Sequence, residues 1–196
     1  MTDLSSRLIG DVRGAGKGLW RLAKFDPAWT AGFDASAAGF VRSFAGPLLA
    51  LPPYLLMMAM LTRDPTEGLA DGGDKLIWAS ALAHIANAVA YPAVMAVVAR
   101  AFGVGEGYGG FIVVTNWAQL FLVTPLAAAS VLTLAGDAGA AVFRFMLLLQ
   151  LVASIYVIWR AARQTLSTEI APALLSVVLA VAISEGVSQA ALFAFR

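Results

Sequence analysis

Residues 111–135 read FIVVTNWAQLFLVTPLAAASVLTLA and contain no Asp, Glu, Lys or Arg. As a helix rising 1.5 Å per residue, this stretch is about 37 Å long, and the hydrocarbon core of a bilayer is about 30 Å thick. A membrane β-barrel is built from short strands of alternating polarity, whereas this stretch is long and mostly apolar throughout. It therefore predicts a membrane-spanning helix.

Four further apolar stretches flank this one, two on each side. A spanning helix needs about 20 mostly apolar residues, and each stretch is of that order. Because lipid offers no partners for free backbone N–H and C=O groups, helices are expected throughout. The sequence thus predicts an all-α fold, a polytopic membrane helix bundle with five transmembrane helices. The predicted spans are residues 44–61, 76–102, 111–135, 138–162 and 170–195.

The connections between these spans are short. Residues 63–75 are acidic and rich in turn formers, and residues 103–110 read GVGEGYGG, which predicts a flexible loop. Gly136 and Asp137 predict a tight turn, and residues 164–169 predict a polar linker.

The composition agrees with a membrane protein and excludes other classes. The 196 residues are 60% hydrophobic and 13% charged, whereas soluble domains are about 45–50% apolar and about 25% charged. The mean hydropathy is +0.81. A net charge of +1 supplies no field that would hold nucleic acid, so no nucleic-acid partner is expected.

Enzyme and metal-site patterns fit this sequence poorly. The chain has no cysteine and a single histidine, which excludes a thiol nucleophile and a multi-histidine metal site. No Gly-x-Ser-x-Gly motif is present. We therefore expect no catalytic residues, no metal and no cofactor, and we do not expect an enzyme.

The distribution of Lys and Arg predicts the orientation of the spans. With five spans, nine of these residues fall on one side and four on the other. The positive-inside rule then places the N-terminus in the cytosol and the C-terminus outside. The chain divides into a cytosolic tail, residues 1–43, and a transmembrane domain, residues 44–196.

The first part of the tail has the pattern of an amphipathic helix. Its apolar residues fill one arc of a helical wheel, and its basic residues fill the opposite arc. Such a helix lies on a membrane with its basic side chains among anionic headgroups. Four glycines weaken it in water, and a flexible basic anchor is an equal alternative. The residues predicted to contact the membrane surface are Arg7, Arg13, Lys17, Arg21 and Lys24.

Several polar side chains interrupt the predicted spans. A charged carboxylate deep in a bilayer costs about 3 kcal/mol on insertion scales, so Glu185 is expected to face protein or water. Glu185, His84 and Gln150 all fall about 12–18 Å from the predicted outer ends of their helices. We therefore predict one intramembrane polar layer in which Glu185 hydrogen-bonds or ion-pairs with His84, directly or through one water. The predicted layer contains His84, Asn87, Gln150, Glu185 and Gln189.

Two interpretations of this layer remain open. Polar side chains commonly join membrane helices by hydrogen bonds, which is a purely structural role. Alternatively, the layer is part of a proton- or ion-linked pathway.

Residues 103–134 read GVGEGYGGFIVVTNWAQLFLVTPLAAASVLTL, a glycine-rich loop entering the third of five spans with a proline inside it. In this layout, and in the short basic linker at residues 160–163, the chain resembles the Yip family of five-span membrane proteins. Bacterial members of that family are mostly uncharacterised, and eukaryotic ones are associated with small GTPases and vesicle traffic. The Asp-Leu-Tyr-Gly-Pro segment of eukaryotic tails is absent here, so the GTPase role is not carried over.

The resemblance implies a bacterial inner (cytoplasmic) membrane protein of scaffold or membrane-organisation type. The alternative is a small transporter or channel subunit with an ion-linked polar layer around Glu185 and His84, and a membrane-embedded lipid enzyme ranks third. The expected partners are the bilayer and anionic headgroups, together with a second copy or another membrane protein.

Overall fold

The computed structural model describes residues 2–64, 68–69, 72–166 and 169–194. Two short strands, β1 (Arg63–Asp64) and β2 (Gly68–Leu69), pair antiparallel; the remaining elements are helical. The helical elements are α1 (Thr2–Ala23), η1 (Pro27–Gly32), α2 (Ala37–Ser43), α3 (Ala45–Leu61), α4 (Gly73–Ala101), α5 (Gly105–Ser130), η2 (Val131–Ala135), α6 (Asp137–Ala161), η3 (Ala162–Leu166) and α7 (Ile170–Ala194).

Five helical segments of the described chain are long and apolar enough to cross a membrane, which confirms the predicted all-α membrane bundle. Their bounds agree with the predicted spans to within a few residues at most ends. The largest difference is at the start of the first and third spans. Residue 195, the predicted end of the last span, lies outside the described residues. The five segments are Ala37–Leu61, Gly73–Ala101, Gly105–Ala135, Asp137–Leu166 and Ile170–Ala194.

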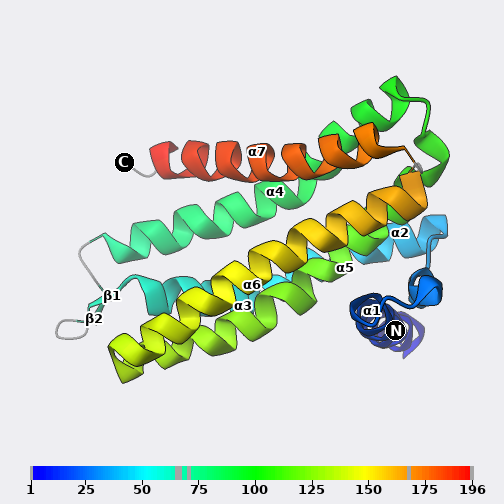
Figure 1. Cartoon of the computed structure of the whole chain (residues 1–196). Helices are drawn as coiled ribbons and strands as arrows, with labels where there is room; N and C mark the ends of the chain where they lie inside the picture. Colours follow the sequence, from blue (N-terminus) through cyan, green and yellow to red (C-terminus); the bar gives the residue numbers. More distant parts are fainter. Residues whose placement is uncertain (1, 65–67, 70–71, 167–168, 195–196) are drawn as a thin grey trace.

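The spanning helices run antiparallel to their neighbours in sequence (Figure 1). Helix α4 pairs closely with α7, and α5 packs between α3 and α6. The two groups meet where α3 contacts α4 and, more sparsely, where α6 contacts α7. The N-terminal helix and the last helix end at opposite ends of the bundle, as an odd number of crossings requires (Figure 1). The side on which each end lies stays a prediction.

The prediction of a flexible loop at residues 103–110 is wrong beyond Val104, because α5 already begins at Gly105. Tertiary contacts override the weak helix propensity of the glycines. The Tyr108 hydroxyl donates to the Pro92 carbonyl at 2.9 Å. A Cβ at Gly107 would overlap the backbone of Thr165, so glycine is required where this turn meets η3.

The first three residues of the predicted polar linker, 164–166, are helical rather than part of a linker. Residues Ala162–Leu166 continue α6 as a π-helical turn. Gln164 accepts a hydrogen bond from the buried indole of Trp29 at 2.6 Å and donates to the Pro27 carbonyl at 3.1 Å. These two bonds fasten η1 to the junction between the fourth and fifth spans.

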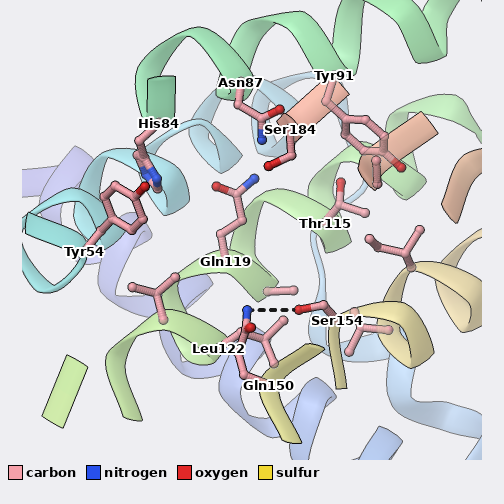
Figure 2. A pocket seen from close by; sticks show the side chains of 15 residues that line it. Tyr54, His84, Asn87, Tyr91, Thr115, Gln119, Leu122, Gln150, Ser154 and Ser184 are labelled. Atoms are coloured by element: carbon pink, nitrogen blue, oxygen red, sulfur yellow. Dashed lines mark hydrogen bonds between the residues drawn. The ribbon is translucent and has the colours of Figure 1, made fainter. Parts of the chain in front are cut away.

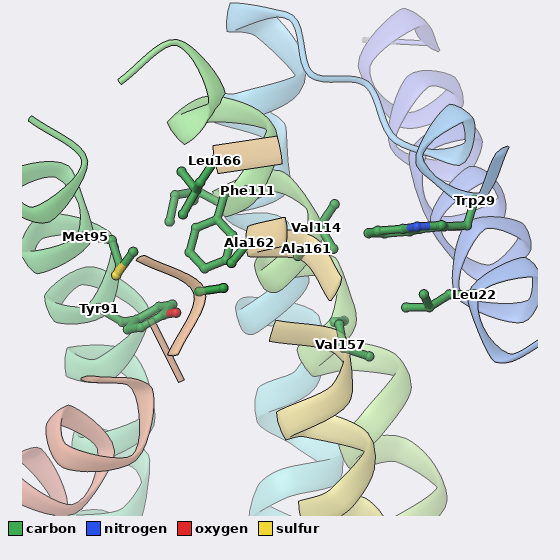
Figure 3. Close-up of a cluster of buried hydrophobic side chains, with 13 residues drawn as sticks. Leu22, Trp29, Tyr91, Met95, Phe111, Val114, Val157, Ala161, Ala162 and Leu166 are labelled. Atoms are coloured by element: carbon green, nitrogen blue, oxygen red, sulfur yellow. The ribbon is translucent and has the colours of Figure 1, made fainter. Parts of the chain in front are cut away.

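Helix α1 crosses the direction of the spans and is seen nearly end-on in Figure 1. Ala15 and Leu22 are buried on its inner side, and Trp29 of η1 is fully buried. Figure 3 shows Leu22 and Trp29 directed toward Val157 and Val114 of the bundle. Residues 2–23 are therefore helical and packed on the bundle, while the predicted membrane-surface role of this helix stays a prediction.

Glycines make this docking possible. A Cβ added to Gly14 would overlap the Gly32 carbonyl, and one added to Gly18 would lie 2.8 Å from the Trp29 carbonyl oxygen. The glycines that lower the helix propensity of α1 thus let η1 pack directly on its backbone.

An ion-pair cluster adds to this contact. The Arg42 guanidinium of α2 donates from Nε to Asp11 at 2.6 Å and from Nη2 to Asp34 at 2.6 Å. Hydrogen bonds from Ser36 lower the pKa of Asp34 below its usual value. Arg42 is one of the nine basic residues on the predicted cytosolic side. Its ion pair with Asp11 joins α1 to the first span.

Alanine substitutions at Gly14 and at Gly10 of α1 should have opposite effects on stability. Gly14→Ala should lower the free energy of unfolding by about 1–3 kcal/mol, because the added methyl overpacks the contact with η1. Gly10 has open space around its Cα, so Gly10→Ala should raise helix stability by about 1 kcal/mol. Thermal unfolding in detergent and the rate of tryptic cleavage within α1 measure both effects. Equal destabilisation by the two variants would contradict the docked arrangement.

Reporter fusions test the orientation. We expect fusions at the N-terminus and in residues 164–169 to report the cytosol, because nine of the thirteen Lys and Arg residues lie on that side. Fusions in residues 63–75 and at the C-terminus should report the outside. A cytosolic C-terminus would contradict five crossings.

Candidate functional site

A polar cavity of about 260 Å³ lies between the five spanning helices (Figure 2). Gln119 and Gln150, which line it, are near the middle of the third and fourth spans. The cavity is therefore deep in the membrane region. Every spanning helix contributes at least one polar lining residue: Tyr54 from α3; His84, Asn87 and Tyr91 from α4; Thr115 and Gln119 from α5; Gln150 and Ser154 from α6; and Ser184 from α7.

His84 joins α4 to the first span at one wall of the cavity. Its Nε2 lies 2.9 Å from the Pro47 carbonyl oxygen. A carbonyl only accepts, so Nε2 carries the proton and donates. The imidazole also stacks on the Tyr54 ring, with centroids 4.8 Å apart and planes 27° apart. This histidine thus has a structural partner on α3.

The other polar groups are less completely paired. Gln150 donates to the Ser154 hydroxyl at 3.1 Å, within α6, and the Tyr91 hydroxyl donates to the Ser176 carbonyl at 3.2 Å. Asn87 Oδ1 is buried and has no hydrogen-bond partner within the described part of the chain. Figure 2 shows Asn87, Gln119 and Ser184 converging on the same space. A buried acceptor without a partner costs about 1–3 kcal/mol. The converging amide and hydroxyl groups can both donate and accept hydrogen bonds to a molecule in this space.

The structure brings together three of the five residues predicted to form the polar layer, namely His84, Asn87 and Gln150. It does not bring Glu185 and Gln189 to them. Glu185 is exposed and accepts a hydrogen bond from Gln189 Nε2 at 2.7 Å, one turn along α7.

The predicted pairing of Glu185 with His84 is therefore wrong, and helical geometry explains why. Depth along each helix was the basis of the prediction, but rotation about the helix axis decides which side chains meet. Ser184 lines the cavity, and the next residue is turned by about 100° in a helix of 3.6 residues per turn. Glu185 consequently lines a separate groove on the outer side of the contact between α6 and α7, beside Leu151 and Val181.

Sequence reasoning left out several lining residues. Gln150 and Ser154 are four residues apart, a spacing that places both on one helix face and is readable in the sequence. Tyr91 shares the face of His84 and Asn87 in the same way. Tyr54 and Thr115 carry no such signal, because their place depends on how α3 and α5 are rotated in the bundle.

The basic residues predicted to contact the membrane surface have exposed side chains, four on α1 and one in the turn that follows it: Arg7, Arg13, Lys17, Arg21 and Lys24. Arg21 also lies 3.6 Å from Asp26, and the Lys24 ammonium lies 4.7 Å from the centre of the Trp20 ring. Their contact with anionic headgroups stays a prediction.

Among the described residues, none that lines the cavity is Asp, Glu, Lys or Arg. The lining offers amide, hydroxyl and imidazole groups, which recognise neutral molecules through hydrogen bonds. Water also fits such a polar space, since buried waters are held by two to four polar partners.

Comparison of the chain with protein-family models, with curated proteins and with solved structures finds no match. The likeness to the Yip family therefore rests on the layout of the spans and stays a prediction.

A double-mutant cycle distinguishes the two arrangements of Glu185. Because Glu185 and His84 have different partners, Glu185→Gln and His84→Gln should be additive in unfolding free energy to within about 0.5 kcal/mol. Ser43 and Asn116 supply a positive control, because Asn116 Nδ2 donates to the buried Ser43 hydroxyl at 3.0 Å. The cycle of Ser43→Ala with Asn116→Ala should show coupling of about 0.5–3 kcal/mol. Unfolding in mixed detergent micelles provides the measurement, and strong coupling of Glu185 to His84 would restore the sequence prediction.

Proposed function

We propose that this chain is a small membrane transporter or channel subunit that binds an uncharged polar solute between its five spanning helices. The observation that carries this proposal is the polar cavity to which all five helices contribute. Polar groups inside a bilayer are costly and mark solute pathways when they converge on one space. The cavity is small, since pockets for drug-sized ligands are about 300–1,000 Å³. A solute of a few heavy atoms fits it.

The packing of the helices suggests how a solute enters. Ser154, Ala180 and Ser184 line both the cavity and the groove on the outer side of the α6–α7 contact. Only a thin layer of side chains therefore separates the two spaces. Helix α7 packs mainly against α4 and contacts α6 much less. A small movement of α4 and α7 away from α6 would connect the cavity with its surroundings, as in rigid-body gating of one group of helices against another.

Flux into proteoliposomes tests this proposal. Glycerol and urea are suitable probes, because both are small, neutral and able to donate hydrogen bonds. We expect the protein to accelerate the shrinking and re-swelling of vesicles after an osmotic step with one of these probes. Asn87→Leu and Gln119→Leu should bring the rate close to that of protein-free vesicles, because they remove polar groups from the cavity.

Gln189→Leu is the matched control, since this amide is exposed on the outer side of α7 and does not line the cavity. It should leave the flux unchanged. Circular dichroism and unfolding temperature establish that each variant is folded. If neither probe crosses faster with the protein than without it, or if folded Asn87→Leu and Gln119→Leu transport normally, the proposal is wrong.

A second proposal keeps the scaffold or membrane-organisation role, and a different observation supports it. Glu185 and Gln189 form a polar pair on the exposed side of α7, within an otherwise apolar span. A carboxylate facing lipid is unfavourable, so a second copy or another membrane protein covering this side would stabilise it. In this proposal the α7 face is the site of association.

Disulfide trapping tests the association with a second copy. The native chain has no cysteine, so each variant carries a single thiol. We expect Gln189→Cys to form a disulfide-linked dimer in membranes under mild oxidation. Leu148→Cys, on the exposed side of α6, is the control and should stay monomeric. Equal cross-linking at both positions would indicate random collision.

A further inference from the structure

A second cavity lies outside the polar one, at the contact between the N-terminal helix and the bundle. It is a groove of about 320 Å³ enclosed by α1, α5 and α6. Its walls are almost entirely apolar and include Leu19 and Trp20 of α1, Phe121 of α5, and Ala153 and Tyr156 of α6. A Cβ added to Gly16 would lie 3.1 Å from the Phe121 ring, so the absence of a side chain lets α1 approach α5 closely here. The groove therefore has the chemistry of an acyl-chain site.

Two polar groups of α6 have no hydrogen-bond partner within the described residues, one on a residue that lines the groove and one on a residue beyond its lining. They are the buried hydroxyl oxygen of Tyr156 and the buried Nε of Arg160. Arg160 follows Tyr156 by four residues and so lies one turn further along the same face of α6. An unpaired buried donor is costly, and a guanidinium N–H more so than a neutral one. Both groups donate hydrogen bonds, and a phosphate oxygen would accept from both.

Cationic and aromatic side chains at the end of α1 and just after it lie beside the groove. The Lys24 ammonium lies over the ring of Trp20, at the edge of the groove. Phe25 packs edge-on against the Tyr156 ring, with centroids 6.1 Å apart. Its φ of 59° is in the left-handed region, which costs a non-glycine residue about 1–2 kcal/mol. The chain thus holds Phe25 in an unfavourable conformation beside Tyr156. The nearest acid along the chain, Asp26, lies 3.6 Å from Arg21.

We propose that this groove binds one anionic phospholipid. An acyl chain lies between α1, α5 and α6, and the phosphate accepts hydrogen bonds from Tyr156 and Arg160 with Lys24 nearby. Binding of one lipid at one site differs from the general adhesion of a basic helix to a membrane. It is also independent of solute transport, since the groove is a different cavity.

A phospholipid fits this groove and its donors better than a free phosphate does. The donors lie beside a groove with apolar walls, and free phosphate would leave those walls without a ligand. An acyl chain fills the apolar part while the headgroup satisfies the donors. Anionic lipids are favoured over zwitterionic ones, because each nearby basic residue contributes about 1 kcal/mol at a membrane surface.

Native mass spectrometry of the full chain in mild detergent tests the proposal. The protein is incubated with equal amounts of phosphatidylglycerol and phosphatidylcholine. We expect one phosphatidylglycerol to be retained in preference to phosphatidylcholine. Tyr156→Phe and Arg160→Gln should each weaken its retention about tenfold, the loss expected for one hydrogen bond to a charged group. Inorganic phosphate in excess should not displace it.

Two controls separate this site from general attraction of anionic lipid. Arg144→Gln removes a cation from the other end of α6, and Arg13→Gln removes one from α1 about 16 Å along the helix from Lys24. Both should retain the lipid as the native chain does. Equal loss in all four variants, unchanged retention in Tyr156→Phe and Arg160→Gln, or displacement by inorganic phosphate would each overturn the proposal. If Arg160→Gln does not fold, Tyr156→Phe decides the outcome, because it changes only one hydroxyl.

Discussion

Close packing around the first half of α5 is the contact on which the rest of the structure depends. Every residue of α5 from 111 to 118 is buried, although the chain as a whole exposes many apolar side chains to lipid. Apolar surface gives little drive to associate helices in a bilayer, so van der Waals packing and hydrogen bonds must hold them. Gly46 of the first span allows a close approach of the two backbones, since a Cβ there would overlap the Asn116 carbonyl. Asn116 then reaches the Ser43 hydroxyl, and Ala15 of α1 packs against Val113 and Trp117.

Serine and threonine side chains in the spans bond mostly to carbonyls of their own helix, whereas three ring-bearing side chains bond to a carbonyl of another helix. His84 donates to the Pro47 carbonyl, Tyr108 to the Pro92 carbonyl and Tyr91 to the Ser176 carbonyl. These bonds fit the structural interpretation of intramembrane polar groups. The cavity does not fit that interpretation, because Asn87, Gln119 and Ser184 converge there and Asn87 Oδ1 has no hydrogen-bond partner within the described residues. The functional proposal therefore depends on the polar group that helix packing does not satisfy.

Helix α6 lies between the two cavities. Leu122 of α5 and Val157 of α6 line both the polar cavity and the apolar groove beneath α1. On its other side, α6 meets α7 through Ser154 and Ile158, which also line the outer groove next to Glu185. The polar cavity, the apolar groove and the exposed carboxylate are thus arranged around one helix. Their chemistries differ because each face of α6 meets a different neighbour.

The sequence by itself determined the membrane class and the number of spans, and it left a helix and a flexible segment as alternatives for the tail. Length and hydropathy are properties of a segment alone, and a bilayer accepts only a few backbone structures. The sequence also identified His84, Asn87 and Gln150 as polar residues at similar depth. Only the tertiary structure decided which of them meet. The depth of a side chain in the membrane follows from its position along the helix, whereas the neighbour that it contacts depends on how the helix is rotated about its axis. For that reason Ser184 lines the cavity while Glu185 does not, and glycines that weaken α1 in isolation become its contact with η1.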